Sequence, residues 1–219
     1  MLNAALEALP YLAEGTLYTI AISIIALFIG LLIGVLIAMM RVYGGNFARR
    51  FAATYILILR GFPSLVTLFI VYFVIASSVN LSPFLAGCVA LGVTSSAYQA
   101  EIFRGAIQAV SQGQMMAARA LGMSRWQAIL YIILPQALRN AIPGWSNEAA
   151  VVVKDSSLVY AVGLAELLRR SQQVAARLRA PLLIFAIAGA IYFLLTFATN
   201  RLLSWLEEKL RIPQMVEAR

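Results

Sequence analysis

The stretch TLYTIAISIIALFIGLLIGVLIAMM, residues Thr16–Met40, runs for 25 positions without a charged side chain. A helix of roughly 20 apolar residues crosses the ~30 Å hydrocarbon core of a bilayer. Two further stretches are also uncharged, Gly61–Ala100 over 40 positions and Ala180–Asn200 over 21. They lack the strict alternation of membrane β-barrel strands, so helices must satisfy the backbone hydrogen bonds within lipid. The sequence therefore predicts an all-α membrane protein.

The composition supports the same class. Of the 219 residues, 62% are hydrophobic and only 12% are charged, whereas soluble domains carry about 25% charged residues. The 17 Lys and Arg exceed the 9 Asp and Glu, an excess that cytoplasmic loops explain better than nucleic-acid binding. With no His and one cysteine, Cys88, the chain cannot form a disulfide framework or a Cys/His metal site by itself. We expect it to bind no metal and no cofactor.

Hydropathy divides the chain into about five spans within one transmembrane domain, 1–219, with its core at 12–208. The predicted spans are 16–40, 51–76, 84–103, 141–161 and 181–203.

The charges predict the orientation of these spans. An odd number of spans places the termini on opposite sides, and 11 of the 17 cations then fall on one side, which should be cytoplasmic. The N-terminus is therefore expected outside and the C-terminus inside, with no cleaved signal peptide because no basic residue precedes the first span. Four arginines at 169–179 conflict with this assignment. Four spans would remove the conflict, but only by discarding a well-formed span.

Two of the spans are irregular. Arg60-Gly61-Phe62-Pro63 interrupts the second span, and a proline there removes a backbone hydrogen bond. We expect a kink, with Arg60 buried against another helix or reaching toward the interface. The fourth span carries charges: Lys154 lies roughly 15 Å along the helix from Gly144, close to the middle of the membrane.

The longest stretch between spans, Arg104–Arg139, has a pattern of its own. Residues 114–121 and 125–134 are predicted as two short helices joined by Gly122-Met123-Ser124, with Pro135 ending the second. A helical hairpin on the cytoplasmic face is typical of a docking element.

The residues of this hairpin carry a family resemblance. Met116-Ala117-Ala118-Arg119-Ala120-Leu121-Gly122, then nine residues, then Ile132-Ile133-Leu134-Pro135, resembles the EAA loop of bacterial ATP-binding-cassette (ABC) import permeases. That pattern reads Glu-Ala-Ala, three residues, Gly, nine residues, Ile-x-Leu-Pro, and every spacing matches. The flanks resemble the polar amino acid uptake subfamily, which includes histidine, glutamine and arginine permeases. Those flanks are residues 60–63, 98–107, 134–139 and 154–158.

The resemblance implies a type I importer (MetI-like) fold in a bacterial cytoplasmic (inner) membrane, with a coupling helix in loop 112–135. It implies two cytoplasmic ABC ATPase subunits that bind ATP and Mg, a second permease subunit and an extracytoplasmic solute-binding protein. Whether the second permease is a copy of this chain stays open. The residues expected to contact the ATPase are Met116, Ala117, Ala118, Arg119, Leu121, Gly122 and Ser124.

The chain departs from the motif at its first position, where Met116 replaces the acid. Either Met115 and Met116 pack into an apolar groove of the partner, or docking is weaker than in the family. The small residues have a second explanation, because Ala and Gly also allow close helix packing within one chain. This subunit is not expected to be an enzyme, since neither Lys154 nor Lys209 follows a glycine and no phosphate-binding loop exists.

Polar residues at membrane depth are the candidates for a substrate pathway. A zwitterionic amino acid needs an anion, Asp155 or Glu101, and a cation, Lys154; alternatively Lys154 pairs with Asp155 or Glu148 and only joins helices. Other classes considered are an ATPase-independent channel or secondary transporter and a membrane enzyme, but no internal repeat or catalytic cluster is visible. The candidate pathway residues are Tyr98, Gln99, Glu101, Asn147, Glu148, Lys154, Asp155 and Ser156.

Overall fold

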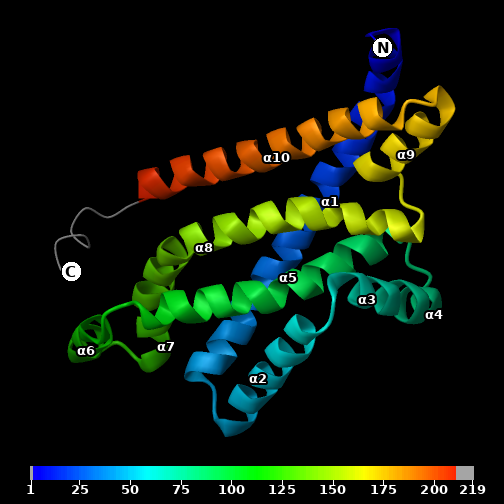
Figure 1. Cartoon of the computed structure of the whole chain (residues 1–219). Coiled ribbons are helices and arrows are strands. Elements are labelled where there is room, and N and C mark those ends of the chain that lie inside the picture. The colour runs from blue at the N-terminus through cyan, green and yellow to red at the C-terminus, as the bar shows by residue number, and fades with distance from the viewer. Residues whose placement is uncertain (1, 211–219) are drawn as a thin grey trace.

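In the computed structural model, which describes residues 2–210, all the regular elements are helices (Figure 1). The long ones are α1 (Leu2–Tyr43), α2 (Asn46–Gly61), α5 (Pro83–Gln108), α8 (Leu134–Asp155), α9 (Leu167–Leu178) and α10 (Pro181–Leu210). The short ones are α3 (Ser64–Phe69), α4 (Ser77–Val79), α6 (Gln112–Ala120), α7 (Arg125–Ala128), the π-helical turns Ile70–Ala76 and Ile129–Ile133, and the 3-10 helix Ser156–Val162.

Helix α5 lies at the centre of the bundle. It contacts α1, α2, α3 and α8, and 15 of its residues are buried. In Figure 1, α10, α8 and α5 run side by side and α1 crosses behind them. Four polar residues of α5, Thr94, Ser95, Ser96 and Gln99, are buried and face protein rather than lipid. The helix can therefore cross the bundle although it is less apolar than a span surrounded by lipid would have to be.

The predicted fold class is confirmed, and each predicted span corresponds to a helical segment. By length and composition, the described part of the chain has two helices able to cross a membrane, Leu6–Tyr43 and Pro181–Leu210. A third is added if Asn46–Gly61 and Ser64–Val79 are counted as one bent span. The remaining two predicted spans correspond to α5, most of which is buried, and to α8, of which seven residues are buried.

The second span is broken rather than kinked. Helix α2 ends at Gly61, Phe62 and Pro63 are extended, and the chain turns by 103° into α3. Pro63 lacks an N–H and disfavours helical backbone in the residue before it, which ends α2 at this point. Of the two expectations for Arg60, burial against another helix is wrong, and the alternative, a side chain that reaches toward the interface, stays a prediction. Its side chain is exposed, and its guanidinium lies 5.1 Å from the ring centre of Tyr98 on α5.

The prediction that Pro135 ends a helix is wrong as well. The chain continues from α7 through the π-helical turn Ile129–Ile133 into α8, and Pro135 lies in the first turn of α8. The proline is accommodated because the π-helical turn just before it already departs from the regular α-helical hydrogen-bond pattern. The fourth span therefore begins at Leu134 rather than at 141.

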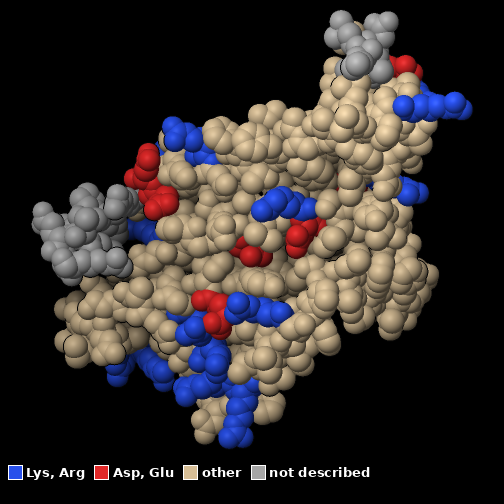
Figure 2. All heavy atoms as spheres, viewed as in Figure 1, with Lys and Arg blue, Asp and Glu red and all other residues tan. Residues whose placement is uncertain are grey.

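Helix α9, with the residue that caps its C-terminal end, carries the four arginines at 169–179 that conflict with the predicted orientation of the spans. It packs along the N-terminal part of α1, where Arg170 donates to Glu14 over 2.5 Å and Arg177 pairs with Glu7. Two of the four arginines at this end are therefore neutralised by acids of α1. Lys and Arg also gather at the opposite end, where α1 ends and α2 begins (Figures 1 and 2). The predicted tail cations Arg211 and Arg219 lie outside the described residues.

Close contact between α1 and α5 depends on small residues of both helices. A Cβ at Gly34 would lie 2.9 Å from the Gln99 Cβ and 3.1 Å from the Ser96 carbonyl oxygen, and a Cβ at Gly92 would lie 2.7 Å from Ile29. Neither glycine has positive φ, so the constraint is the space between the two backbones. This contact sets where the polar residues of α5 lie relative to the rest of the bundle.

We expect Gly34→Val to lower the Tm of the purified protein by about 5 °C or more, because the added carbons force α1 away from α5. Gly189→Val on α10 is the matched control, since a Cβ at Gly189 meets nothing within 4 Å. Thermal unfolding of both variants in the same detergent measures the effect. Equal Tm values for the two variants would contradict the packing described for α1 and α5.

Candidate functional site

A polar cavity lies between α5, α8 and the start of α3. Its volume is about 260 Å³, and it brings together residues that are far apart in the chain. It is lined by Ser64, Leu91, Thr94, Ser95, Tyr98, Asn147, Glu148, Val151, Val152 and Asp155. The 103° break after α2 places Ser64 at its rim, so the irregular backbone at Pro63 borders a cavity, as expected for non-helical backbone at membrane depth.

Two carboxylates face this cavity from α8. Glu148 is 7% exposed and accepts a hydrogen bond of 2.7 Å from the Ser95 hydroxyl. Asp155, half-buried, accepts a bond of 3.3 Å from the Ser64 hydroxyl. The two acids are seven residues apart, which is two helical turns, so they share one face of α8. Among residues 2–210, which the structure describes, no Lys or Arg lines the cavity, so the charged side chains of this lining are acidic.

A cation, Arg60, lies over the ring of Tyr98. Tyr98 lines the cavity, so this guanidinium stands beside the cavity rather than inside it. A small zwitterion in the cavity would therefore have carboxylates on one side and a cation on another.

The structure separates the predicted pathway residues into three groups. Tyr98, Asn147, Glu148 and Asp155 line the cavity, as expected for a pathway. Gln99 and Ser156 are fully buried and do not line it, and the Ser156 hydroxyl donates to the Val153 carbonyl.

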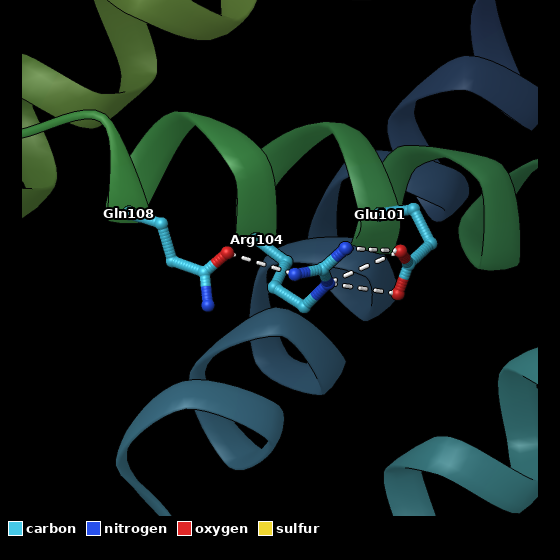
Figure 3. A network of polar contacts seen from close by, with 3 residues as sticks. All are labelled: Glu101, Arg104 and Gln108. Atoms are coloured by element: carbon cyan, nitrogen blue, oxygen red, sulfur yellow. Dashed lines mark hydrogen bonds and ion pairs between the residues drawn. The ribbon is translucent and has the colours of Figure 1, made fainter.

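Glu101 and Lys154, the third group, lie away from the cavity. Figure 3 shows Glu101 paired with Arg104 on the next turn of α5, with nitrogen and oxygen 2.7 Å apart, while Arg104 also donates to Gln108. Lys154 is exposed and takes part in none of the ion pairs formed among the described residues. Neither predicted role for Lys154, as substrate cation or as partner of Asp155 or Glu148, matches this arrangement.

Several polar residues were missed by the sequence analysis. Ser64 and Thr94 line the cavity, and the only signal for Ser64 was its position directly after the Pro63 break. Glu166 is 0% exposed and accepts from the backbone N–H groups of Leu168 and Arg169, which begins α9, and from the Tyr192 hydroxyl. A single acid in a polar connection carries no pattern that would have identified it.

The hairpin of α6 and α7 forms a second candidate site, at the far end of the bundle from α9 (Figure 1). Gly122 joins the two helices with φ of +84°, a left-handed conformation that favours glycine. Ser124 begins α7 by a capping box, in which its hydroxyl accepts from the Gln127 N–H and its own N–H donates to the Gln127 side chain. Arg119 closes the turn through a 2.9 Å bond to the Met123 carbonyl.

The hairpin exposes large apolar side chains. Met116 is 67% and Leu121 is 84% exposed, and Trp126 and Tyr131 are also largely exposed. Ala118, in contrast, is 4% exposed, so this residue of the motif packs within the chain, as expected if small residues allow close helix packing. Met116 and Leu121 of the same motif remain exposed. Contiguous exposed apolar residues on a polar end of a protein are typical of a protein–protein contact.

The comparisons with known proteins cover almost the whole chain. Residues 30–212 match the family described as binding-protein-dependent transport system inner membrane component. The glutamine transport system permease protein of Escherichia coli K12 is 37% identical over 213 residues, which cover 96% of this chain and 97% of that protein. The nopaline transport system permease protein of Agrobacterium fabrum is 34% identical, with 94% and 92% covered. The crystal structure of an amino acid ABC transporter with histidines has a TM-score of 0.83 at 36% identity, covering 94% and 96%.

We expect a polar methanethiosulfonate reagent to label Asn147→Cys in membrane vesicles, because Asn147 lines the cavity and is exposed. Cys88, the natural cysteine, is 0% exposed and should stay unlabelled in the unchanged protein. Ala150→Cys is the matched control on the same helix, since Ala150 is 5% exposed and does not line the cavity. Labelling of Asn147→Cys no faster than Ala150→Cys would show that the cavity is closed to water.

Proposed function

We propose that this chain, which belongs to the family of binding-protein-dependent transport system inner membrane components, is the permease subunit of an ABC importer that carries polar amino acids into the cell. Its relatives include permeases for glutamine and for nopaline, and a solved relative is an amino acid ABC transporter. The observation that carries the proposal is the combination of an acidic cavity inside the bundle with an exposed apolar hairpin at one end. Neither a channel nor a secondary transporter working without an ATPase needs such a hairpin.

The hairpin is the proposed docking site of a cytoplasmic ABC ATPase. Met116 and Leu121 supply apolar surface, and they replace the contact that an acid at position 116 would make in the family motif. Gly122 and the capping box of Ser124 hold α6 and α7 at a defined angle, so that movement of the ATPase is passed to α5 and α8, which the hairpin joins. Two ATPase subunits, which bind ATP and Mg, and a second permease subunit complete the proposed assembly.

The proposed orientation places the hairpin inside the cell and the N-terminus outside. The α1–α2 connection carries Arg41, Arg49 and Arg50, and this end of the bundle should face the cytoplasm. Helix α9 then lies on the outer side, where an extracytoplasmic solute-binding protein would deliver the substrate. Glu14 and Glu7 pair with Arg170 and Arg177 of α9 and so reduce the net positive charge on that side.

We place the substrate in the cavity, with its ammonium group toward Glu148 and Asp155. These acids replace Glu101 in that role, because Glu101 is already paired with Arg104. Arg60, beside Tyr98, replaces Lys154 as the cation for the substrate carboxylate. Alternating access would open this cavity to one side of the membrane at a time as the bundle moves against its partner permease.

Gly122→Asp should reduce ATP hydrolysis coupled to transport to the basal rate, while the chain still inserts in the membrane. An aspartate at φ of +84° strains the turn, and its charge enters an apolar contact. Substrate-stimulated ATP hydrolysis of the reconstituted complex measures the effect. Gly45→Asp is the control, because Gly45 has an ordinary φ of −68° and open space around it. Full coupling in Gly122→Asp would contradict the docking assignment.

Glu148→Gln should weaken amino acid binding to the permease by roughly tenfold or more, since a hydrogen bond to a charged group contributes about 1.5–3 kcal/mol. Lys154→Met should leave it unchanged, because Lys154 is exposed and is not among the residues that line the cavity. Binding of labelled L-glutamine to the permease–ATPase complex without its binding protein measures both. A larger effect of Lys154→Met than of Glu148→Gln would contradict the placement of the substrate.

A further inference from the structure

A chain of hydrogen bonds crosses the core from α8 through α5 and back to the cavity. The Trp145 indole N–H donates to the Gln99 side-chain oxygen over 2.7 Å. The Gln99 amide nitrogen donates to the Ser95 hydroxyl over 3.0 Å, and that hydroxyl donates to a Glu148 carboxylate oxygen over 2.7 Å. Gln99 thus stands two bonds away from the carboxylate that faces the cavity, although it does not line the cavity itself.

The indole of Trp145, which begins this chain, sets the direction of every hydrogen bond in it. An indole nitrogen can only donate, so the group of Gln99 that faces Trp145 must be its oxygen. The amide nitrogen of Gln99 therefore faces the other way, with two hydrogens to place. One goes to the Leu27 carbonyl on α1 over 3.3 Å, and the other goes to Ser95.

Ser95 has only one proton to donate. Its oxygen already accepts from Gln99, so its own hydrogen is free to point at Glu148. Glu148 is the acceptor in that bond. The amide of Gln99 thus determines, through one hydroxyl, that a hydrogen-bond donor from α5 is aimed at the Glu148 side chain.

Packing confines the Gln99 amide, and its hydrogen-bond partners keep it from turning over. The side chain is 0% exposed, and a Cβ at Gly30 of α1 would lie 2.3 Å from its amide nitrogen. Gly30 therefore leaves just enough room for the amide nitrogen, which lies against α1 in one orientation. The oxygen and the nitrogen of the Gln99 amide thus have different partners in a fixed orientation, which is more than is required to join three helices.

We propose that Gln99 is a positioning residue for amino acid recognition, which acts through Ser95 to hold the Glu148 carboxylate as the partner of the substrate ammonium group. This inference rests on the proposed function of the cavity. It assigns Gln99 no contact with substrate. The specificity it provides is for a positively charged amino group over an uncharged position in the same ligand.

The test compares two ligands on the reconstituted permease–ATPase complex without its binding protein. One is L-glutamine, and the other is glutaramate, the same molecule without the α-ammonium group. We expect Gln99→Met and Ser95→Ala each to weaken L-glutamine binding roughly tenfold and to leave the weak binding of glutaramate unchanged. The double variant should be no weaker than either single variant, because both break the same chain of bonds.

Two further variants guard against a purely structural effect. Gln108→Met makes the same substitution on an exposed position of α5 and should change neither affinity. Gly30→Ala, from the other helix, crowds the amide of Gln99 and should reproduce the loss for L-glutamine alone.

The outcomes separate the inference from the function on which it rests. Equal weakening of both ligands by Gln99→Met, or additive losses in the double variant, would overturn the positioning role. If Glu148→Gln weakens L-glutamine binding and Gln99→Met does not, the inference fails and the cavity remains the site. If the unchanged complex fails to bind L-glutamine, both the site and the inference are overturned.

Discussion

The close contact between α1 and α5 is the constraint on which the rest of this structure depends. Membrane helices gain little from hydrophobic burial against one another, so packing and internal hydrogen bonds must hold them together. Glycines at positions 30, 34 and 92 bring the two backbones together, and the Gln99 amide occupies the space that remains. The amide nitrogen of Gln99 donates to α1 and to Ser95 of α5, and its oxygen accepts from α8. Because both ends of the amide have partners, this polar group can be buried in the bundle.

The cavity follows from that arrangement together with the break at Pro63. With α5 held against α1, Ser95 and Tyr98 line the cavity together with residues of α8, and the turn after α2 brings Ser64 to the same place. Glu148 and Asp155 lie on the face of α8 that meets this surface. The apolar hairpin connects the C-terminal end of α5 to the N-terminal end of α8. A force on α6 and α7 therefore acts on both helices that line the cavity.

Features with a strong local pattern could be predicted from the sequence. Uncharged runs located α1 and α10, and Gly122 and Ser124 located the turn and the start of α7, because left-handed backbone and helix capping favour few residue types. Features that depend on tertiary contacts could not. The tertiary packing of α8 decides that Glu148 lines the cavity while Lys154 does not, and the sequence pattern does not reveal it. The role of Pro135 was misjudged because a proline that could end one helix also fits the first turn of the next.

Under the proposed function, the hairpin at the end of α5 and α8 is the contact with an ATPase, and hydrogen–deuterium exchange of the complex tests that contact directly. Comparison of the permease with and without its ATPase should show new protection in residues 112–128. Exchange in the centre of α5, residues 92–100, should stay slow in both states, because the contacts to α1 and α8 hold it. Protection confined to other surfaces, with an unchanged hairpin, would contradict the account.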